Sequence, residues 1–166
     1  AADDPRRPAF DANRQAEIEA VKPVIERLKE TGWTFGSHTW GHIRLDSRPL
    51  ESVQRDTVRW AEEVGSLVGP TNILFYPHGG RPDGDDWHST GPVFQYLQSQ
   101  GFRIFASVGI NSFSYIKKDI SAVICDRLHP DGTTLRNGKA LEWYSQFYDA
   151  REIIDLDVRP DLGVTW

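Results

Sequence analysis

Three stretches of the chain carry apolar residues about one helical turn apart, which predicts three helices. The first begins at Asp11, and Pro23 inside it predicts a kink or a restart. The second begins at Pro49, and the third ends near Gly101. Their apolar positions are Ile18, Val21, Ile25 and Leu28; Leu50, Val53, Thr57, Trp60, Val64 and Leu67; and Val93, Phe94 and Leu97. Residues 1–10 lack such a pattern and are predicted to form an arm or linker.

Short apolar runs between these helices predict strands. The runs cover residues 33–37, 73–76, 102–108 and 122–126, and a helix over 139–148 and a strand over 152–156 continue the series. Alternating strands and helices predict right-handed β-α-β units, and therefore an α/β fold with a parallel sheet or barrel over residues 11–166. Active sites in such folds lie at the carboxyl ends of the strands.

Composition narrows the classes of partner. The formal net charge is -5 and there is no basic run, which argues against nucleic acid and favours a neutral or cationic substrate. No apolar run approaches the roughly 20 residues of a membrane span, and the polar start is not a signal peptide. The single cysteine, Cys125, excludes an internal disulfide and is predicted to be a buried structural thiol.

His38 and His42 are candidate metal ligands, because they follow the predicted strand over 33–37 with a spacing of i, i+4. If the chain turns helical there, both rings share one face and each offers a nitrogen lone pair to a metal ion. Ser37 or Thr39 would orient a ring through its second nitrogen. The alternative is two unrelated polar residues in a loop, because the motif is short.

The segment 36–42, Gly-Ser-His-Thr-Trp-Gly-His, resembles the His-Ser/Thr-x-x-His motif of polysaccharide deacetylases of the NodB-homology type. The resemblance implies that His38 and His42 bind a divalent metal, zinc or a similar ion. It also implies a partial or distorted (β/α) barrel. Segment 75–79 resembles the family's Arg-x-Pro-Tyr/Phe-Gly motif, which forms one wall of the substrate groove. That match implies substrate contacts for Tyr76, Pro77 and His78.

This second motif departs from the family pattern at two positions. Phe75 stands where the family has an arginine that orients the catalytic aspartate, so this role would pass to another residue, for example Arg81. His78 stands where the family has an aromatic ring. His78 therefore either lines the groove or is an exposed loop residue.

The family's Thr-Phe-Asp-Asp segment, which supplies the catalytic base and the third metal ligand, has no match in this sequence. We therefore expect either the C-terminal part of a longer domain or a lost base. The loop after the second motif is acidic, and its members either complete the site or are simply solvated: Asp83, Asp85, Asp86 and His88. Trp87 in this loop is either a sugar platform or a loop anchor.

The pair Leu128-His129 resembles the family's last motif, whose histidine is the general acid; the alternative is a simple turn. Asp126 and Arg127 would form a charge pair that tunes His129. The chain is thus predicted to be a metal-dependent hydrolase that removes N- or O-acetyl groups from a polysaccharide or oligosaccharide. The alternatives are a catalytically inactive carbohydrate-binding domain on the same fold and a different two-histidine hydrolase completed by the acidic loop. The resemblance implies a secreted or cell-surface protein of a bacterium.

Overall fold

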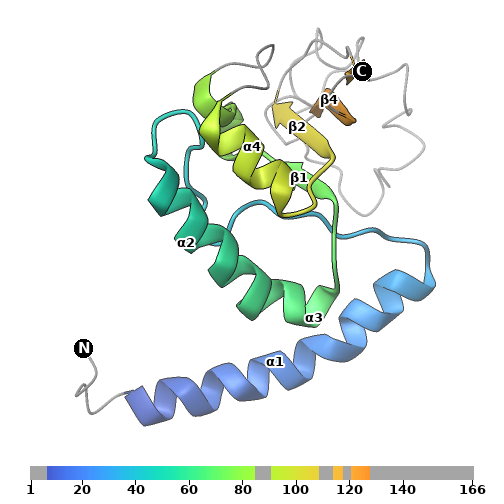
Figure 1. The fold of residues 1–166 in the computed structure, drawn as a ribbon. Helices are drawn as coiled ribbons and strands as arrows, with labels where there is room; N and C mark the ends of the chain where they lie inside the picture. Colours follow the sequence, from blue (N-terminus) through green and yellow to red (C-terminus); the bar gives the residue numbers. More distant parts are fainter. Residues whose placement is uncertain (1–6, 85–90, 109–113, 118–120, 128–166) are drawn as a thin grey trace, which may run out of the picture.

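The computed structural model describes residues 7–84, 91–108, 114–117 and 121–127, which form an α/β structure around one sheet (Figure 1). The helices are α1 (Arg7–Glu30), α2 (Leu50–Trp60), α3 (Ser66–Val68) and α4 (Pro92–Ser99), and a π-helical turn η1 (Ala61–Gly65) joins α2 to α3. The strands are β1 (Ile73–Phe75), β2 (Ile104–Val108), β3 (Ser114–Lys117) and β4 (Ala122–Arg127). Two 3-10 turns, η2 (Pro77–Gly79) and η3 (Pro82–Gly84), follow β1.

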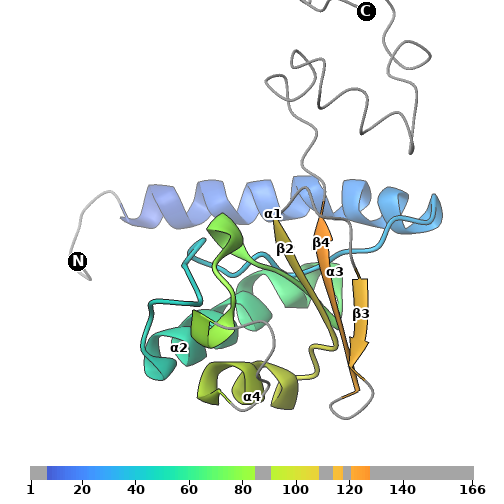
Figure 2. The same ribbon diagram turned by 90° about the horizontal axis from the view of Figure 1, so that it is seen from above.

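The sheet has the order β1-β2-β4-β3. β1, β2 and β4 are parallel, and α4 joins β1 to β2, which confirms the predicted parallel pairing. β3 was not predicted, and it runs antiparallel to β4. The connection from Lys117 to Ala122 is too short for the crossover of a dozen or so residues that a parallel neighbour requires. The described strands form an open sheet (Figure 2).

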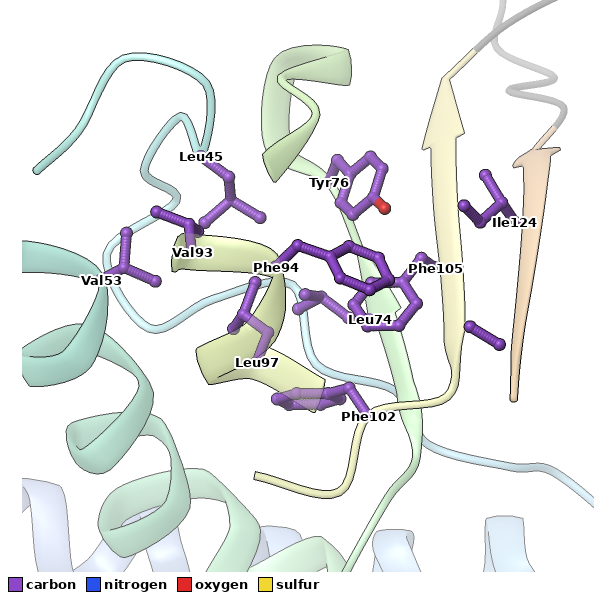
Figure 3. Close-up of a cluster of buried hydrophobic side chains, with 11 residues drawn as sticks. Leu45, Val53, Leu74, Tyr76, Val93, Phe94, Leu97, Phe102, Phe105 and Ile124 are labelled. Carbon is purple, nitrogen blue, oxygen red and sulfur yellow. The ribbon is translucent and has the colours of Figure 1, made fainter. Parts of the chain in front are cut away.

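The hydrophobic core lies between the sheet and the helices α2 and α4 (Figure 3). Leu74, Phe105 and Ile124 contribute from neighbouring strands, because alternate residues of a strand point to the same face. Phe94 of α4 stacks on Phe105, with the ring centroids 4.7 Å apart. Phe75 and Arg127 point to the opposite face of the sheet, where the guanidinium carbon of Arg127 lies 5.7 Å from the centroid of the Phe75 ring.

Two predicted elements differ from the structure. Helix α1 begins at Arg7, inside the predicted arm, and continues through Pro23 to Glu30. Pro23 is exposed, so water can satisfy the carbonyl that loses its intrahelical bond. The predicted strand over 33–37 is reduced to one parallel bridge between Ser37 and Leu74.

α1 lies along one edge of the structure, next to α3 (Figure 1). Among the described helices, none is both long and apolar enough to cross a membrane. The predicted elements over 139–148 and 152–156 lie outside the described residues.

Candidate metal centre

Three histidine rings lie in a row at the carboxyl end of β1. The centroids of His38 and His42 are 4.8 Å apart, and those of His42 and His78 are 4.4 Å apart. His38 and His42 belong to the loop between the Ser37 bridge and α2, whereas His78 belongs to the turn that follows β1. The structure thus brings together the exposed histidine of the second motif and the pair of the first.

The loop that carries His38 and His42 is not helical. Thr39 and His42 have positive φ angles of 61° and 50°, so the i, i+4 argument for a shared helix face does not apply. The rings are adjacent because the loop folds back on itself. Ser37 and Thr39 bond to the loop backbone: Ser37 Oγ accepts from the Thr39 N–H at 3.2 Å, and Thr39 Oγ1 accepts from the Ile43 N–H at 3.1 Å. Neither hydroxyl is seen to orient a ring, in contrast to the expectation from the sequence.

Asp56 of α2, only 8% exposed, attaches this loop to the helix. Its two carboxylate oxygens accept the backbone N–H groups of Trp40 at 2.9 Å and Gly41 at 2.7 Å. A Cβ at Gly41 would lie 3.0 Å from Asp56 Oδ2, so a side chain there would crowd the contact. The sequence offered no signal for Asp56 beyond a polar residue on a predicted helix.

The ring of His38 is oriented by a backbone carbonyl. Its Nδ1 lies 2.9 Å from the oxygen of Phe75. Because a carbonyl oxygen can only accept, Nδ1 carries the hydrogen, and the Nε2 lone pair of the neutral ring is left free. Burial lowers the pKa of His38 below its ordinary value, the bond to Phe75 opposes this, and the nearby Arg127 charge lowers it further. These effects favour the neutral imidazole of His38 over its charged form.

A neutral imidazole with one nitrogen fixed by a carbonyl is the kind of donor that zinc takes in proteins. The chemistry of the donors therefore fits a divalent ion. Within the described ranges, however, no group of three or more histidine, cysteine, aspartate or glutamate side chains is placed to hold a metal ion. The described residues thus supply suitable donors without a completed ligand set.

The second motif contributes less to the site than its resemblance implied. Tyr76 is 1% exposed and packs against Phe105 in the core, and the side chain of Pro77 is also buried. This burial does not fit the predicted substrate contacts of Tyr76 and Pro77. Tyr76 follows Leu74 by two residues along the strand direction, and this places both on the core face. His78, with φ 56°, is the exposed member of the three.

Arg127 is a cation that acts on this group of histidines, and its position here was not expected from the sequence. Its guanidinium carbon lies 5.7 Å from the centroid of the Phe75 ring, and Phe75 is the residue that replaces the family's arginine. Arg127 Nε is buried and has no hydrogen-bond partner among the described residues. The charge of Arg127 also lowers the pKa of His38, whereas the role expected of Arg81 stays a prediction. Only the pairing of β4 with β2 brings Arg127 to this place.

The remaining candidates divide into two groups. Asp83 accepts the backbone N–H groups of Val93 at 3.1 Å and Phe94 at 2.9 Å, so it caps the start of α4. Cys125 is half-buried, and burial raises the pKa of its thiol, which agrees with a structural role. Outside the described residues lie Asp85, Asp86, Trp87, His88 and His129.

A comparison with known protein families matches the part of the chain that contains both motifs. The sequence model of the family described as polysaccharide deacetylase matches residues 9–102, which include the loop of His38 and His42 and the turn of His78. Neither curated proteins nor solved structures gave a significant match. Because the matched segment covers more than half of the chain, the chain belongs to the polysaccharide deacetylase family.

Proposed function

We propose that this chain is a metal-dependent carbohydrate deacetylase, a hydrolase that removes N- or O-acetyl groups from a polysaccharide. His38 and His42 would be ligands of a divalent ion, zinc or a similar metal. The observation that carries the proposal is the adjacency of the two rings, 4.8 Å apart, with the His38 Nδ1 fixed by the Phe75 carbonyl. The family match supports the reaction class.

Each residue of the site has a defined part in this proposal. A divalent ion there would polarise the acetyl carbonyl and acidify a water molecule. The Phe75 carbonyl keeps the free nitrogen of His38 available, and Asp56 keeps the loop in place. The exposed His78 is in position to hydrogen-bond a substrate beside His42. His129 would protonate the leaving amine or alcohol, as the resemblance implies.

The wider features of the proposal follow the family. We expect residues 11–166 to form one catalytic domain with the distorted barrel of the NodB-homology type. The parallel strands β1, β2 and β4 are compatible with such a barrel. A secreted or cell-surface location is part of the same proposal.

The metal assignment can be tested by titrating the metal-free protein with zinc or cobalt, followed by calorimetry or by the cobalt absorption spectrum. The double variant His38→Ala/His42→Ala should lose stoichiometric binding. Trp33→Ala, a change at a side chain that is 66% exposed, is the control and should bind as the wild type does. If the double variant binds metal unchanged, the assignment is wrong.

The second candidate is a catalytically inactive carbohydrate-binding domain on the same fold. Phe75 in place of the family's arginine and the unmatched Thr-Phe-Asp-Asp segment favour it. Metal-dependent release of acetate from acetylated chitooligosaccharides or xylan would exclude this candidate. Binding of these sugars without any acetate release would instead exclude the deacetylase.

A further inference from the structure

A groove of about 450 Å³ lies between the histidine loop and α2. The segment between α1 and α2 passes beside β1 before it reaches this helix (Figure 1). The groove volume is within the ~300–1,000 Å³ of small-ligand sites. Its polar and aromatic walls include Trp40, Arg48, Ser52, Arg55 and Arg59. Trp40 and Gly41, which line the groove, stand between His38 and His42 in the chain, so the groove and the candidate metal centre share one loop.

The groove carries positive charge. Arg48 precedes α2, and Arg55 and Arg59 are spaced i, i+4 on that helix, so they share one side of it. The carboxylate among the lining residues is Asp56, and its oxygens already accept the two N–H groups of the loop. It is therefore poorly placed to satisfy the arginines.

Two of these arginines lack the partners that other basic residues have. On α1, Lys22, Arg27 and Lys29 each pair with a glutamate three residues away. In the described part of the chain, Arg48 and Arg55 have no ion pair, and Arg55 donates only to Ser52 Oγ, at 3.1 Å. Most of their N–H donors therefore have no partner among the described residues, and both side chains are exposed, so they are available to a ligand.

The third arginine completes an aromatic wall. The guanidinium carbon of Arg59 lies 3.5 Å from the centroid of the Trp40 ring, and both side chains bond to Glu63. Trp40 is nevertheless 40% exposed. A sugar ring can therefore contact the apolar part of this wall while a charged substituent meets the free arginines.

We propose that this groove binds an anionic sugar of the polysaccharide, one that bears a carboxylate, next to the acetylated sugar. Guanidinium groups match carboxylates with two parallel hydrogen bonds, which gives direction as well as charge. This inference rests on the proposed function, because it names the substrate class for the same site. It also replaces the neutral or cationic substrate that the net charge of -5 favoured.

The experiment measures binding of a galacturonate tetramer and of neutral chitotetraose to the full chain by calorimetry. The test variant is Arg48→Gln/Arg55→Gln. The control is Arg27→Gln/Lys29→Gln, which removes the same charge from the exposed end of α1. The test variant should bind the uronate about tenfold or more weakly, since it loses charge-assisted hydrogen bonds. The control should bind it as the wild type does, and circular dichroism should show both variants folded.

Three outcomes would overturn the proposal: no uronate binding by the wild type, equal losses in both variants, or equal affinity for the neutral sugar. Binding of a sulfated tetramer in preference to the uronate would overturn the carboxylate assignment. Acetate release from neutral acetylated chitooligosaccharides should be the same in the wild type and the control variant Arg27→Gln/Lys29→Gln. If acetate release fails in both while uronate binding depends on Arg48 and Arg55, the deacetylase assignment is wrong. The assignment of the groove as a binding site for a carboxylate-bearing sugar is then still supported.

Discussion

Asp56 is the residue on which the geometry of the histidine loop depends most. The loop includes two residues other than glycine with positive φ, Thr39 and His42, and such conformations cost about 1–3 kcal/mol each. The two bonds from Asp56 to the Trp40 and Gly41 N–H groups offset that cost. A carboxylate accepts backbone N–H groups more strongly than a neutral side chain does.

Replacement of Asp56 by alanine should therefore loosen the loop. We expect the free energy of unfolding to fall by about 2–4 kcal/mol, because two buried charge-assisted bonds are lost. Zinc affinity should fall by about 10- to 100-fold, the range for residues that position ligands. Urea denaturation and zinc titration measure the two effects.

Asp56→Asn and Glu51→Ala separate positioning from general destabilisation. Asparagine keeps one acceptor oxygen, so Asp56→Asn should bind zinc with intermediate affinity. Glu51 is exposed in the first turn of the same helix, and its replacement by alanine should change neither quantity much. Unchanged zinc affinity in Asp56→Ala would show that the loop holds its shape without the carboxylate.

At the scale of elements, α1 is the least typical part of the structure. It has 24 residues with Pro23 in its interior, and Ile25 is the buried one among its described side chains. Val21 and Val24 are 39% and 53% exposed, although the pattern places Val21 on the apolar face. The salt bridge from Arg14 to Glu63, at 2.5 Å, ties the helix to η1.

Pro23→Ala should stabilise α1 locally. A proline inside a helix costs about 3 kcal/mol, because it removes one backbone bond and crowds the preceding turn. Amide hydrogen exchange in the turn before residue 23 should therefore slow. The exchange of β1 and β2 amides should change little, since α1 buries little against the core.

Val21→Ala is the matched control for this experiment, because it changes an exposed side chain in the same turn without restoring a backbone donor. It should leave exchange in α1 nearly unchanged. Equal slowing in both variants would mean that side-chain packing, and not the backbone of Pro23, limits the stability of α1.

At the scale of the whole molecule, the stability of the metal-free protein should depend on pH through His38. The folded structure lowers the pKa of His38 from its ordinary value of 6.5, mainly by burial. Below that value the unfolded chain binds a proton more readily than the folded chain does, so folding weakens as the pH falls. The stabilisation by neutral His38 is complete above pH 6.5 and is lost as the pH falls through the lower folded pKa.

Urea denaturation in the presence of a chelator, repeated between pH 7.5 and about 5, measures this effect. His38→Gln should flatten the dependence in that window. Glu63 does not interfere, because its neighbour Arg59 lowers its pKa from 4.5 to about 2, so its contribution is lost only at more acidic pH. Equal slopes in the wild type and His38→Gln would contradict the role of His38.

The local pattern of apolar and polar residues was enough to predict most of the described helices and strands. Apolar periodicity located α2, α4, β1, β2 and β4, because each buries one face and the buried positions must repeat with the geometry of the element. The strand and helix order also predicted the parallel pairing of β1, β2 and β4. The two motifs were visible because they are contiguous in the sequence, and they were enough to indicate the family that the comparison then showed.

Only the tertiary structure decided how the site is assembled. The approach of His78 to His42, the bonds from Asp56 to the loop and the position of Arg127 over Phe75 all join residues from separate elements. For Tyr76 the motif suggested a substrate contact, but the alternation of side chains along the strand directs this residue into the core. Sequence spacing measures distance along the chain, whereas these contacts depend on strand order, register and loop conformation. Long-range packing sets those, and no short pattern encodes them.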